Sequence, residues 1–416
     1  MALHEILLKQ RLEYERKLKE TYIRREIRLK GLETHMISVI IGPRRAGKSF
    51  FCMHALHGLE RTAYVNFDDE TLLTIQSFDE ILTALEGVYG QVETLLLDEI
   101  QNLPDWELIA NRLQREGYRL VLTGSNSKLL SSELSTHLTG RHYQTCLLTF
   151  SFREILNLAE RDSTLPGKQA LLSNYLNQGG FPEPWVKGLD FRDYLSALYD
   201  SVLYRDIIRR HRIRFPSMLE GLAKHLISSI TGEFTARSLA SAIGAQSDHT
   251  MLKYYSCLEE AFLFFRVPRF SFKVKDQVKT AAKLYCYDNG FMLAKGFNFS
   301  TNTGKLLENA VAVTLKQQEL DGSLHFFYWK NEKNEEVDFV VQKGVKVERL
   351  IQVCADLTDP AVGRREVRAL LKAGEAIHCT NLTIVTLDVE KKEKQSWFGL
   401  EAVVEYIPFG KWSAAG

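Results

Sequence analysis

The chain has 416 residues, of which 45% are hydrophobic and 25% are charged, an ordinary globular mixture with enough length for roughly three domains. Its formal net charge of +1 excludes a global field strong enough to attract nucleic acid, so any such contact must come from local patches. The six cysteines include no C-x-x-C pair, which argues against a zinc site or a disulfide framework and for reduced thiols.

The first 30 residues are densely charged, and residues 3–30 are predicted to form a charged helix. We expect this helix to expose a solvated face and to pack on the domain that follows. No secretory signal peptide is expected at this end, and no stretch reaches the roughly 18 apolar residues that would span a bilayer. The sequence therefore predicts a cytoplasmic protein without membrane contact.

The strongest motif follows in "ISVIIGPRRAGKSFF", where an apolar strand runs into a full G-x-x-x-x-G-K-[ST] match and then into a helical stretch. Such a loop wraps phosphates with backbone N–H groups, and the helix that follows adds its positive end. Lys48 is expected to bridge the β- and γ-phosphates of ATP, and Ser49 to hold Mg²⁺. The expected nucleotide contacts are Gly42, Pro43, Arg44, Arg45, Ala46, Gly47, Lys48, Ser49 and Phe50.

A second apolar strand, in "ETLLLDEIQNLPDWE", ends in Asp98 and Glu99. Parallel sheets place ligands at the carboxyl ends of their strands. We expect Asp98 to order Mg²⁺ and Glu99 to polarise the attacking water, so hydrolysis is predicted and not binding alone. His54 and His57 follow the phosphate loop, but no third ligand is visible, and they are expected to be ordinary helix residues.

The segments "GPRRAGKS", "VNFDDE", "LLLDEIQNLPDWE", "LTGSN", "LTGR" and "LTFSFREIL" together resemble the AAA+ ATPases, in a prokaryotic branch of small single-motor proteins. The resemblance covers residues 36–155 and implies a five-stranded parallel core. It implies that Ser125 or Asn126 is the sensor residue and that Arg141 is an arginine finger. A surface salt bridge is the alternative for Arg141. A finger acts in trans, so a homo-oligomer, a ring or at least a dimer, is expected.

After residue 150 the pattern turns helical and predicts a lid over residues 151–215. The lid ends in a basic run with a single acid, Asp206. This run can contact phosphate or can be a solvated face, and the composition does not decide between them. Its arginines are Arg205, Arg209, Arg210, Arg212 and Arg214.

Residues 216–290 are predicted to form a winged-helix domain, with a helix over 235–243, a turn at Gly244 and a second helix capped by Ser247 or Asp248. The second helix is expected to present His249, Thr250, Lys253 and Tyr254 to DNA. The following wing, residues 266–283, has six basic residues and one acid, an excess suited to a duplex. Packing or protein docking is the alternative for this domain. The basic residues are Arg266, Arg269, Lys273, Lys275, Lys279 and Lys283.

The remaining residues, 291–416, resemble a restriction-endonuclease-like domain of the PD-(D/E)XK type over about residues 304–390. The resemblance rests on Glu308 in a helix, Asp338 in one strand, and Gln352 with Cys354 in the next. Nuclease chemistry needs acids that hold Mg²⁺ and a nearby cation. Gln352 is neutral and Cys354 stands where a lysine is expected, so the site is predicted to be degenerate and inactive. The candidate replacement cations are Lys330, Lys343, Lys346 and the arginines of "GRREVRALLK".

The predicted fold class is therefore α/β and multidomain: the charged helix (1–30), an AAA+ core (31–150), a helical lid, a winged helix and the nuclease-like domain. The predicted function is an ATPase that couples hydrolysis to remodelling or translocation of DNA, with branched junctions as a candidate substrate by fold analogy. A regulatory nucleotide switch that docks a protein partner is the first alternative, and an ATP-dependent nuclease is the second.

Overall fold

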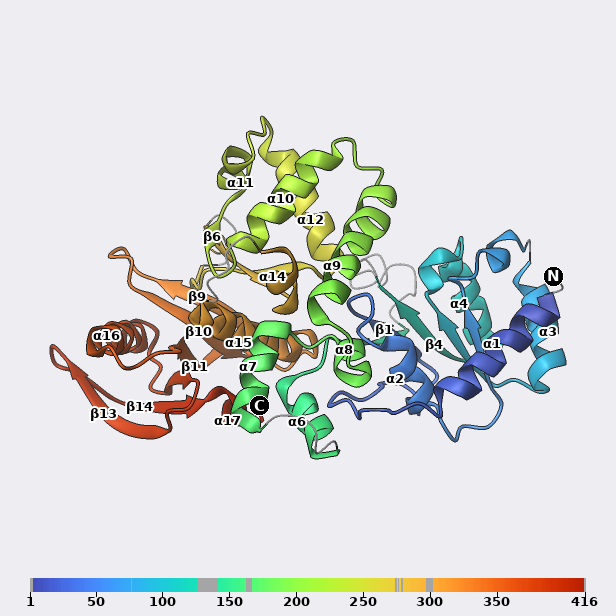
Figure 1. The fold of residues 1–416 in the computed structure, drawn as a ribbon, viewed down its shortest axis with the longest axis horizontal. Helices are drawn as coiled ribbons and strands as arrows, with labels where there is room; N and C mark the ends of the chain where they lie inside the picture. The colour runs from blue at the N-terminus through green and yellow to red at the C-terminus, as the bar shows by residue number, and fades with distance from the viewer. Residues whose placement is uncertain are drawn as a thin grey trace. The chain divides into compact units, whose positions relative to one another are not determined.

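The computed structural model describes residues 3–75, 77–125, 141–161, 167–273, 275, 277, 280–296 and 302–414 (Figure 1). The contacts within the chain divide it into two compact units. The first unit comprises residues 1–149 with 260–262, and the second comprises residues 150–259 with 263–416. Among the described residues, none of the helices is both long and apolar enough to cross a bilayer.

The first unit is built on one parallel sheet in the order β2-β3-β4-β1-β5. Strands β1 and β3 are buried at every residue, as expected for parallel strands that are covered on both faces. This is the AAA-like parallel core that the motifs predict. The strands are β1 (Ile37–Ile41), β2 (Thr62–Asn66), β3 (Thr94–Asp98), β4 (Arg119–Gly124) and β5 (His142–Cys146).

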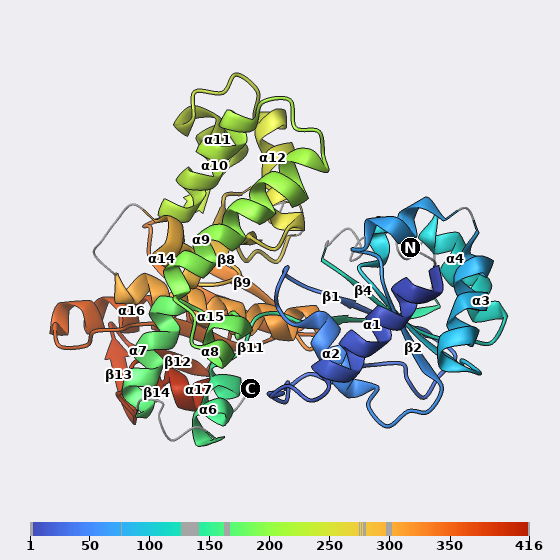
Figure 2. The same cartoon turned by 45° about the vertical axis from the view of Figure 1, so that its right-hand side comes forward.

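Helices α1 (Leu3–Lys17) and α2 (Lys48–Ala55) lie across one face of this sheet (Figures 1 and 2). The chain also forms α3 (Phe78–Tyr89) and α4 (Trp106–Arg115), with short 3₁₀ turns at Glu70–Thr74 and Ile100–Asn102. The helix expected over residues 3–30 ends at Lys17, and residues 18–30 have no regular secondary structure. Tertiary contacts override the helical pattern there, because Ile23 and Arg25 are buried in the first unit.

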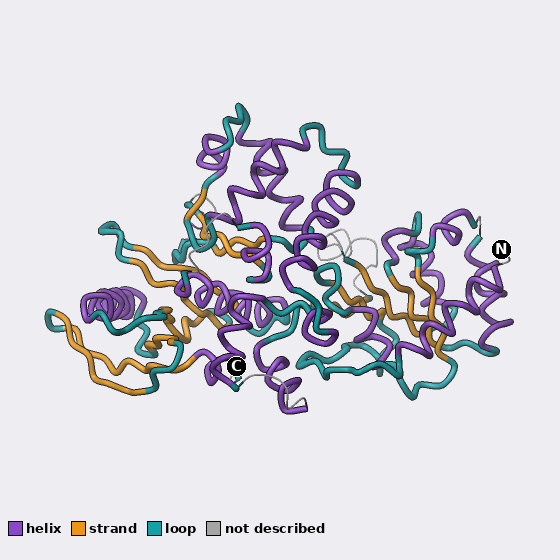
Figure 3. The backbone as a smooth tube through the Cα atoms, in the orientation of Figure 1, coloured by secondary structure: helices purple, strands orange, loops and turns teal. Residues whose placement is uncertain are grey.

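The second unit begins with a series of helices, drawn in purple like the other helices in Figure 3. They are α6 (Phe152–Arg161), α7 (Lys168–Gln178), α8 (Pro182–Lys187), α9 (Phe191–Ser201) and a π-helical continuation at Val202–Arg209.

The next segment combines three helices with a small antiparallel sheet in the order β6-β8-β7. The chain order is helix, strand, helix, helix, strand, strand. These elements are α10 (Pro216–Ser228), β6 (Glu233–Phe234), α11 (Ala236–Ala242), α12 (Asp248–Glu260), β7 (Phe264–Val267) and β8 (Ala282–Cys286), with α14 (Gly290–Lys295) after them.

The C-terminal part contains a six-stranded mixed sheet in the order β13-β14-β12-β11-β10-β9. Strands β9, β10 and β11 are antiparallel neighbours, whereas β11, β12 and β14 run parallel. Helix α15 (Thr303–Leu320) precedes the sheet and α16 (Pro360–Ile377) connects β11 to β12. The strands are β9 (His325–Lys330), β10 (Glu336–Lys343), β11 (Lys346–Val353), β12 (Leu382–Thr386), β13 (Lys391–Trp397) and β14 (Leu400–Pro408), and α17 (Phe409–Trp412) follows.

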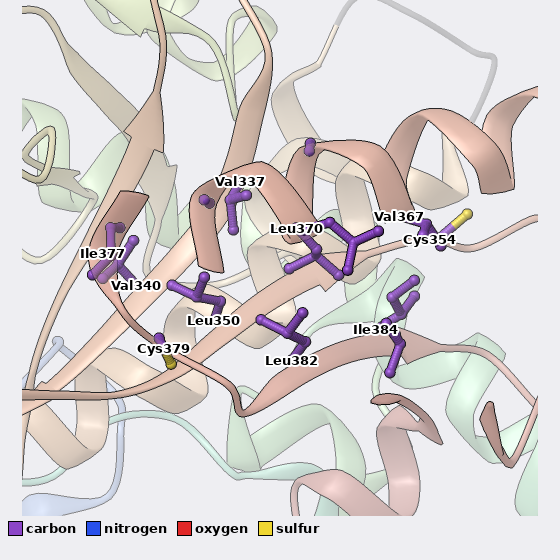
Figure 4. Close-up of a cluster of buried hydrophobic side chains, with 14 of the residues drawn as sticks. Val337, Val340, Leu350, Cys354, Val367, Leu370, Ile377, Cys379, Leu382 and Ile384 are labelled. Atoms are coloured by element: carbon purple, nitrogen blue, oxygen red, sulfur yellow. The ribbon is translucent and has the colours of Figure 1, made fainter. Parts of the chain in front are cut away.

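An apolar core joins α16 to this sheet (Figure 4). Leu370 and Val367 of α16 pack with Leu350 and Cys354 at the end of β11. The thiol of Cys354 is therefore part of the hydrophobic core.

Backbone hydrogen bonds connect the small sheet to the large sheet of the second unit at the residues that directly follow β7. Phe270 N–H donates to the Tyr328 carbonyl at 2.7 Å, and Tyr328 N–H donates to the Pro268 carbonyl at 3.1 Å. The Tyr328 hydroxyl also donates to the Ala281 carbonyl at 2.7 Å. The chain is thus bonded to β9 both where it leaves β7 and where it returns to β8.

Candidate functional sites

The phosphate loop connects β1 to α2 and needs its two glycines. Gly42 has φ 148°, and a Cβ there would lie 2.0 Å from the Leu147 carbonyl oxygen. Gly47 has φ 91° immediately before Lys48, the first residue of α2. Only glycine fits the close approach at the first position without strain, and it is favoured at the second.

Lys48 is buried inside this loop and is held by the loop's own backbone. Its ammonium group donates to the carbonyl oxygens of Gly42 at 3.1 Å and Pro43 at 2.9 Å. The cation therefore lies at the start of α2, where the unpaired N–H groups of a helix favour anions. The loop is a ready anion site with its cation in place.

Asp98 at the end of β3 is buried and accepts three side-chain hydrogen bonds from hydroxyl groups. Ser49 Oγ donates to Oδ1 at 2.8 Å, Tyr64 Oη donates to Oδ2 at 2.9 Å, and Thr123 Oγ1 also donates to Oδ1. Burial and the charge of Glu99 raise the pKa of Asp98, while these hydrogen bonds oppose the rise. Within the part of the chain that the structure describes, the side-chain donors to this carboxylate are all neutral hydroxyls.

Glu99 adopts a left-handed backbone conformation with φ 50°, and its N–H donates to Thr123 Oγ1 at 3.1 Å. Gln101 Nε2 donates to its carboxylate. Burial acts to raise the pKa of Glu99, but the charge of Lys48 and the hydrogen bonds outweigh it and lower that pKa. The side chain is thus an ionised carboxylate, the form that accepts a proton from water.

Two further predicted residues of the ATPase site are described: Ser125 directly follows β4, and Arg141 directly precedes β5. Ser125 is buried beside Glu99, and its hydroxyl contributes to the lowered pKa of that carboxylate. Asn126 lies outside the described residues. Arg141 is exposed immediately before β5, and its carbonyl accepts a hydrogen bond from Ile37 N–H.

Arg25 is a residue of this site that the sequence reasoning missed. Its buried guanidinium donates to the carbonyl oxygens of Ala46, Leu148 and Thr149 at 3.0, 2.7 and 3.1 Å. Arg25 thus braces the phosphate loop against the chain that follows β5. Its position in a run of charged residues hid it, because such a run predicts a solvated helix.

Of the two histidines after the loop, His54 lies in α2 and His57 lies in the turn that follows it. The His54 ring stacks on Tyr22 with centroids 4.1 Å apart, and burial lowers its pKa. His57 is exposed. Among the described residues, no group of three or more His, Cys, Asp or Glu side chains is arranged to hold a metal ion.

The helix α12 presents only part of the face expected to contact DNA. His249 and Lys253 are exposed, and Thr250 is half-buried. Tyr254 corrects the prediction, because it is 4% exposed and its hydroxyl accepts a hydrogen bond from Phe215 N–H. It belongs to the apolar face of α12, which recurs at helical spacing with Met251 and Leu258.

Fewer of the described basic side chains in residues 266–283 are exposed to a DNA partner than the composition suggests. Lys273 and Lys275 are exposed, while Lys279 lies outside the described residues. Arg269 donates to the Lys330 carbonyl, and Lys283 is only 2% exposed. Lys283 therefore does not contribute to a DNA-facing surface, contrary to its count in the predicted wing.

The arginine run at the end of the lid is exposed throughout. Its one acid, Asp206, is buried and does not share that surface. Exposed Tyr204 and Phe215 flank the run, and the guanidinium of Arg214 lies 5.2 Å from the Phe215 ring centroid. The exposed arginines are Arg205, Arg209, Arg210, Arg212 and Arg214.

The nuclease-like residues converge in part. Glu308 of α15 and Asp338 of β10 share one partner, Lys283 of β8. Gln352 of β11 joins them, because its Oε1 accepts from Asp338 N–H at 3.3 Å and its Nε2 donates to Glu366 at 2.6 Å.

Cys354 does not belong to the predicted cluster. It packs in the core of Figure 4, and burial raises its pKa to about 11. Neither lysine of the β10–β11 hairpin supplies the cation that a lysine at position 354 would provide. Lys346 is exposed, and Lys343 pairs with Glu348 at 3.0 Å. Lys330 lies 3.7 Å from Glu336, at the edge of the cluster. In "GRREVRALLK", Arg365 pairs with Glu366 and Arg368 with Glu335.

Three family models match successive parts of the chain. Residues 34–156 match an AAA domain, residues 169–301 match a domain of unknown function, DUF8612, and residues 303–399 match another, DUF4143. The first match contains the phosphate loop, Asp98, Glu99 and Arg141. Arg25 lies outside it.

Two curated relatives align with most of the chain. The "Uncharacterized protein MJ1544" of Methanocaldococcus jannaschii is 34% identical over 95% of this chain and 92% of its own length. An "Uncharacterized protein" of Haemophilus influenzae is 28% identical over 79% of this chain and 84% of its own length.

Solved structures give distant matches. The replication initiator DnaA bound to AMPPCP and single-stranded DNA has a TM-score of 0.31 at 15% identity, over 61% of this chain and 86% of that chain. The Aeropyrum pernix ORC1 protein in complex with DNA has a TM-score of 0.31 at 10% identity, over 67% of this chain and 88% of that chain.

Proposed function

This chain belongs to the same family as the protein MJ1544 of Methanocaldococcus jannaschii, and we propose that it is a Mg²⁺-dependent ATPase that acts on DNA. The AAA domain in the first unit is the proposed motor, and the second unit is the proposed DNA-binding part.

The observation that carries the ATPase proposal is the hydrogen bond from Ser49 to Asp98 beside the phosphate loop, with the Glu99 carboxylate next in the chain. A serine hydroxyl and a carboxylate are oxygen ligands of the kind that Mg²⁺ takes together with water and phosphate oxygens. Bound Mg²⁺ would neutralise charge on the phosphates. Lys48 can exchange its two loop carbonyls for phosphate oxygens, and Glu99 can accept a proton from water.

The exposed arginine run supports the DNA part of the proposal. Five arginines lie within ten residues, the one acid among them is buried, and exposed aromatic rings stand at both ends. Arginines pair with phosphates, and aromatic rings can stack on bases. His249 and Lys253 of α12, with Lys273 and Lys275, are secondary candidates.

Two finer assignments are part of the proposal. The order α10-β6-α11-α12-β7-β8 supports a winged helix, because the second and third helices of such a domain precede a hairpin. The order α15-β9-β10-β11-α16-β12 supports a PD-(D/E)XK-like core whose cutting chemistry has been lost. Remodelling of branched junctions is the narrowest form of the proposal.

A homo-oligomer is proposed because Arg141 is exposed at the start of β5, where it is available to a neighbouring subunit. Arg141→Ala should leave ATP affinity unchanged and lower hydrolysis. Mixing it with Lys48→Ala should restore some activity, since each variant supplies what the other lacks. A fully active monomer would exclude an arginine finger.

The deciding experiment measures ATP hydrolysis with single-stranded, duplex and four-way DNA over a range of salt concentrations. Stimulation that falls with salt supports a DNA motor, and preference for the four-way substrate supports junction remodelling. Hydrolysis indifferent to all three favours a regulatory switch that docks a protein. Metal-dependent cutting of the DNA would favour the nuclease.

A further inference from the structure

Three carboxylates of the second unit converge on the ammonium group of one lysine. Glu308 comes from α15, and Glu336 and Asp338 come from alternate positions of β10. A PD-(D/E)XK-like fold implies Mg²⁺ at such acids. The residues present do not fit that ion, because a side chain of the same protein already stands among the carboxylate oxygens.

That side chain is Lys283 of β8. Its Nζ lies 2.6 Å from Glu336 Oε1, 2.9 Å from Glu308 Oε1 and 3.0 Å from Asp338 Oδ1. An ammonium group has three N–H donors, and three carboxylate oxygens surround this one. Each of the three oxygens lies at hydrogen-bonding distance from the ammonium group.

The surrounding groups complete the cluster without a metal. The Tyr285 hydroxyl donates to Glu308 Oε1 at 2.8 Å, and Val353 N–H donates to Asp338 Oδ2 at 2.9 Å. Lys330 approaches Glu336. The carboxylate oxygens that face Lys283 thus already have donors from β8, and donors from β9 and β11 approach the second oxygens of Glu336 and Asp338.

The position of Lys283 is fixed by the fold around it. Strand β8 pairs with β6 and β7, and the chain leading into β8 is bonded to β9 through the Tyr328 hydroxyl and Ala281. Withdrawal of the lysine would require these contacts to break together. The cation is built into the sheet.

We propose that Lys283 replaces the divalent metal of the nuclease-like acid cluster, so that the cluster is an internal ion-pair joint between β8 and the C-terminal domain. It follows that the intact protein does not bind Mg²⁺ or Mn²⁺ at these acids. It also follows that truncation of Lys283 opens a divalent metal site that the natural chain lacks.

The rival explanation is that Lys283 is a relocated catalytic lysine and that the metal binds beside it. The two explanations predict opposite results for the unchanged protein. A relocated catalytic lysine leaves metal affinity intact, whereas a lysine in the metal position abolishes it.

The experiment titrates Mn²⁺ into the full-length protein without nucleotide and follows binding by calorimetry and by the melting temperature. The variants are Lys283→Ala, Lys283→Met and Lys283→Ala/Asp338→Asn, and Glu308→Gln is made alone. Lys273→Ala is the matched control, because that lysine lies in the same segment and is exposed.

We expect Lys283→Ala to gain one Mn²⁺ site. At 100 times its dissociation constant, the metal should raise the melting temperature by roughly 5 °C. Lys283→Met fills the space and should gain no site, and the double variant should lose it. The unchanged protein, Glu308→Gln and Lys273→Ala should give the same titration curve.

Two results would overturn the proposal. One is a Mn²⁺ site in the unchanged protein that Glu308→Gln removes, which needs no variant of Lys283. The other is a folded Lys283→Ala protein that binds no Mn²⁺. If Lys283→Ala unfolds, refolding in Mn²⁺ that fails to recover it counts against the proposal, and recovery counts for it.

Discussion

Two buried acid sites in this molecule are held in opposite ways. Asp98 in the first unit accepts side-chain hydrogen bonds from the neutral hydroxyl groups of Ser49, Tyr64 and Thr123. Asp338 in the second unit is bonded directly to the ammonium group of Lys283. Neutral hydroxyl partners leave the negative charge of the carboxylate available to an ion from solution. The ammonium group of a lysine in the same chain neutralises that charge instead. A buried carboxylate is therefore an ion-binding site or a joint depending on its donors.

The largest expected effect concerns the first of these sites. Glu99→Gln should keep ATP binding and lower the hydrolysis rate by about 10²- to 10⁴-fold, because a proton acceptor is lost. Lys48→Ala should abolish binding. Binding of a fluorescent ATP analogue and phosphate release would be measured side by side. Hydrolysis by Glu99→Gln at the unchanged rate would remove Glu99 from this role.

A second prediction contrasts the two sites in stability. Lys283→Met leaves buried Asp338 and half-buried Glu308 and Glu336 without their main cation and should lower the free energy of unfolding of the second unit by about 3–5 kcal/mol. Asp98→Asn should cost less, about 1 kcal/mol, because an amide oxygen still accepts from the hydroxyls. Urea unfolding followed in each unit measures both, and equal losses would contradict the contrast.

A third prediction separates the two basic regions. Replacing Arg209, Arg210 and Arg212 by glutamate should weaken duplex binding and lower the slope of log affinity against log salt by about 3. The matched control reverses Lys273, Lys275 and Lys279, which should have a smaller effect. The reverse order of effects would return DNA binding to the predicted wing.

The smallest expected effect is a pH dependence in the second unit. Burial and the charge of Asp338 raise the pKa of Glu308 from 4.5 to about 7, although Lys283 opposes the rise. Between these two pH values the folded state holds a proton that the unfolded chain releases. The contribution of Glu308 protonation to the free energy of unfolding is therefore full below pH 4.5 and is lost as pH rises through about 7. Glu308→Gln should flatten the decline in the free energy of unfolding over this window. The charges of Glu336, Asp338 and Lys283 and the neutral Tyr285 hydroxyl face Glu308 in the unchanged protein and remain in the variant.

Local patterns were sufficient to predict the parallel sheet of the first unit and its phosphate loop. The order of apolar strands, the two glycines and the acids at a strand end each depend on neighbours in sequence, and they predicted the parallel core with Lys48, Ser49 and Asp98 at one site. Tyr64 could not be assigned a role, because a tyrosine within a buried strand has no local signal for its partner.

The second unit depends on contacts between distant segments, and there sequence reasoning was weaker. Lys283 and Asp338 are 55 residues apart along the chain, so counting charges placed the lysine on the surface. One signal was present, since Lys283 stands inside the apolar strand "AKLYC", where a lysine must find buried acids. The exposure of Tyr254 was predicted wrongly. Tyr254 lies at helical spacing from Met251 and Leu258, on the apolar face of α12.

The brace formed by Arg25 has a practical consequence for anyone who expresses the first unit as a fragment. The matched AAA domain begins at residue 34, and the charge pattern placed a boundary at residue 31. A clone started at either point would leave the carbonyls of Ala46, Leu148 and Thr149 without their donor. Such a fragment would retain the whole phosphate-binding motif and still hold its loop loosely, so a useful fragment must include Arg25.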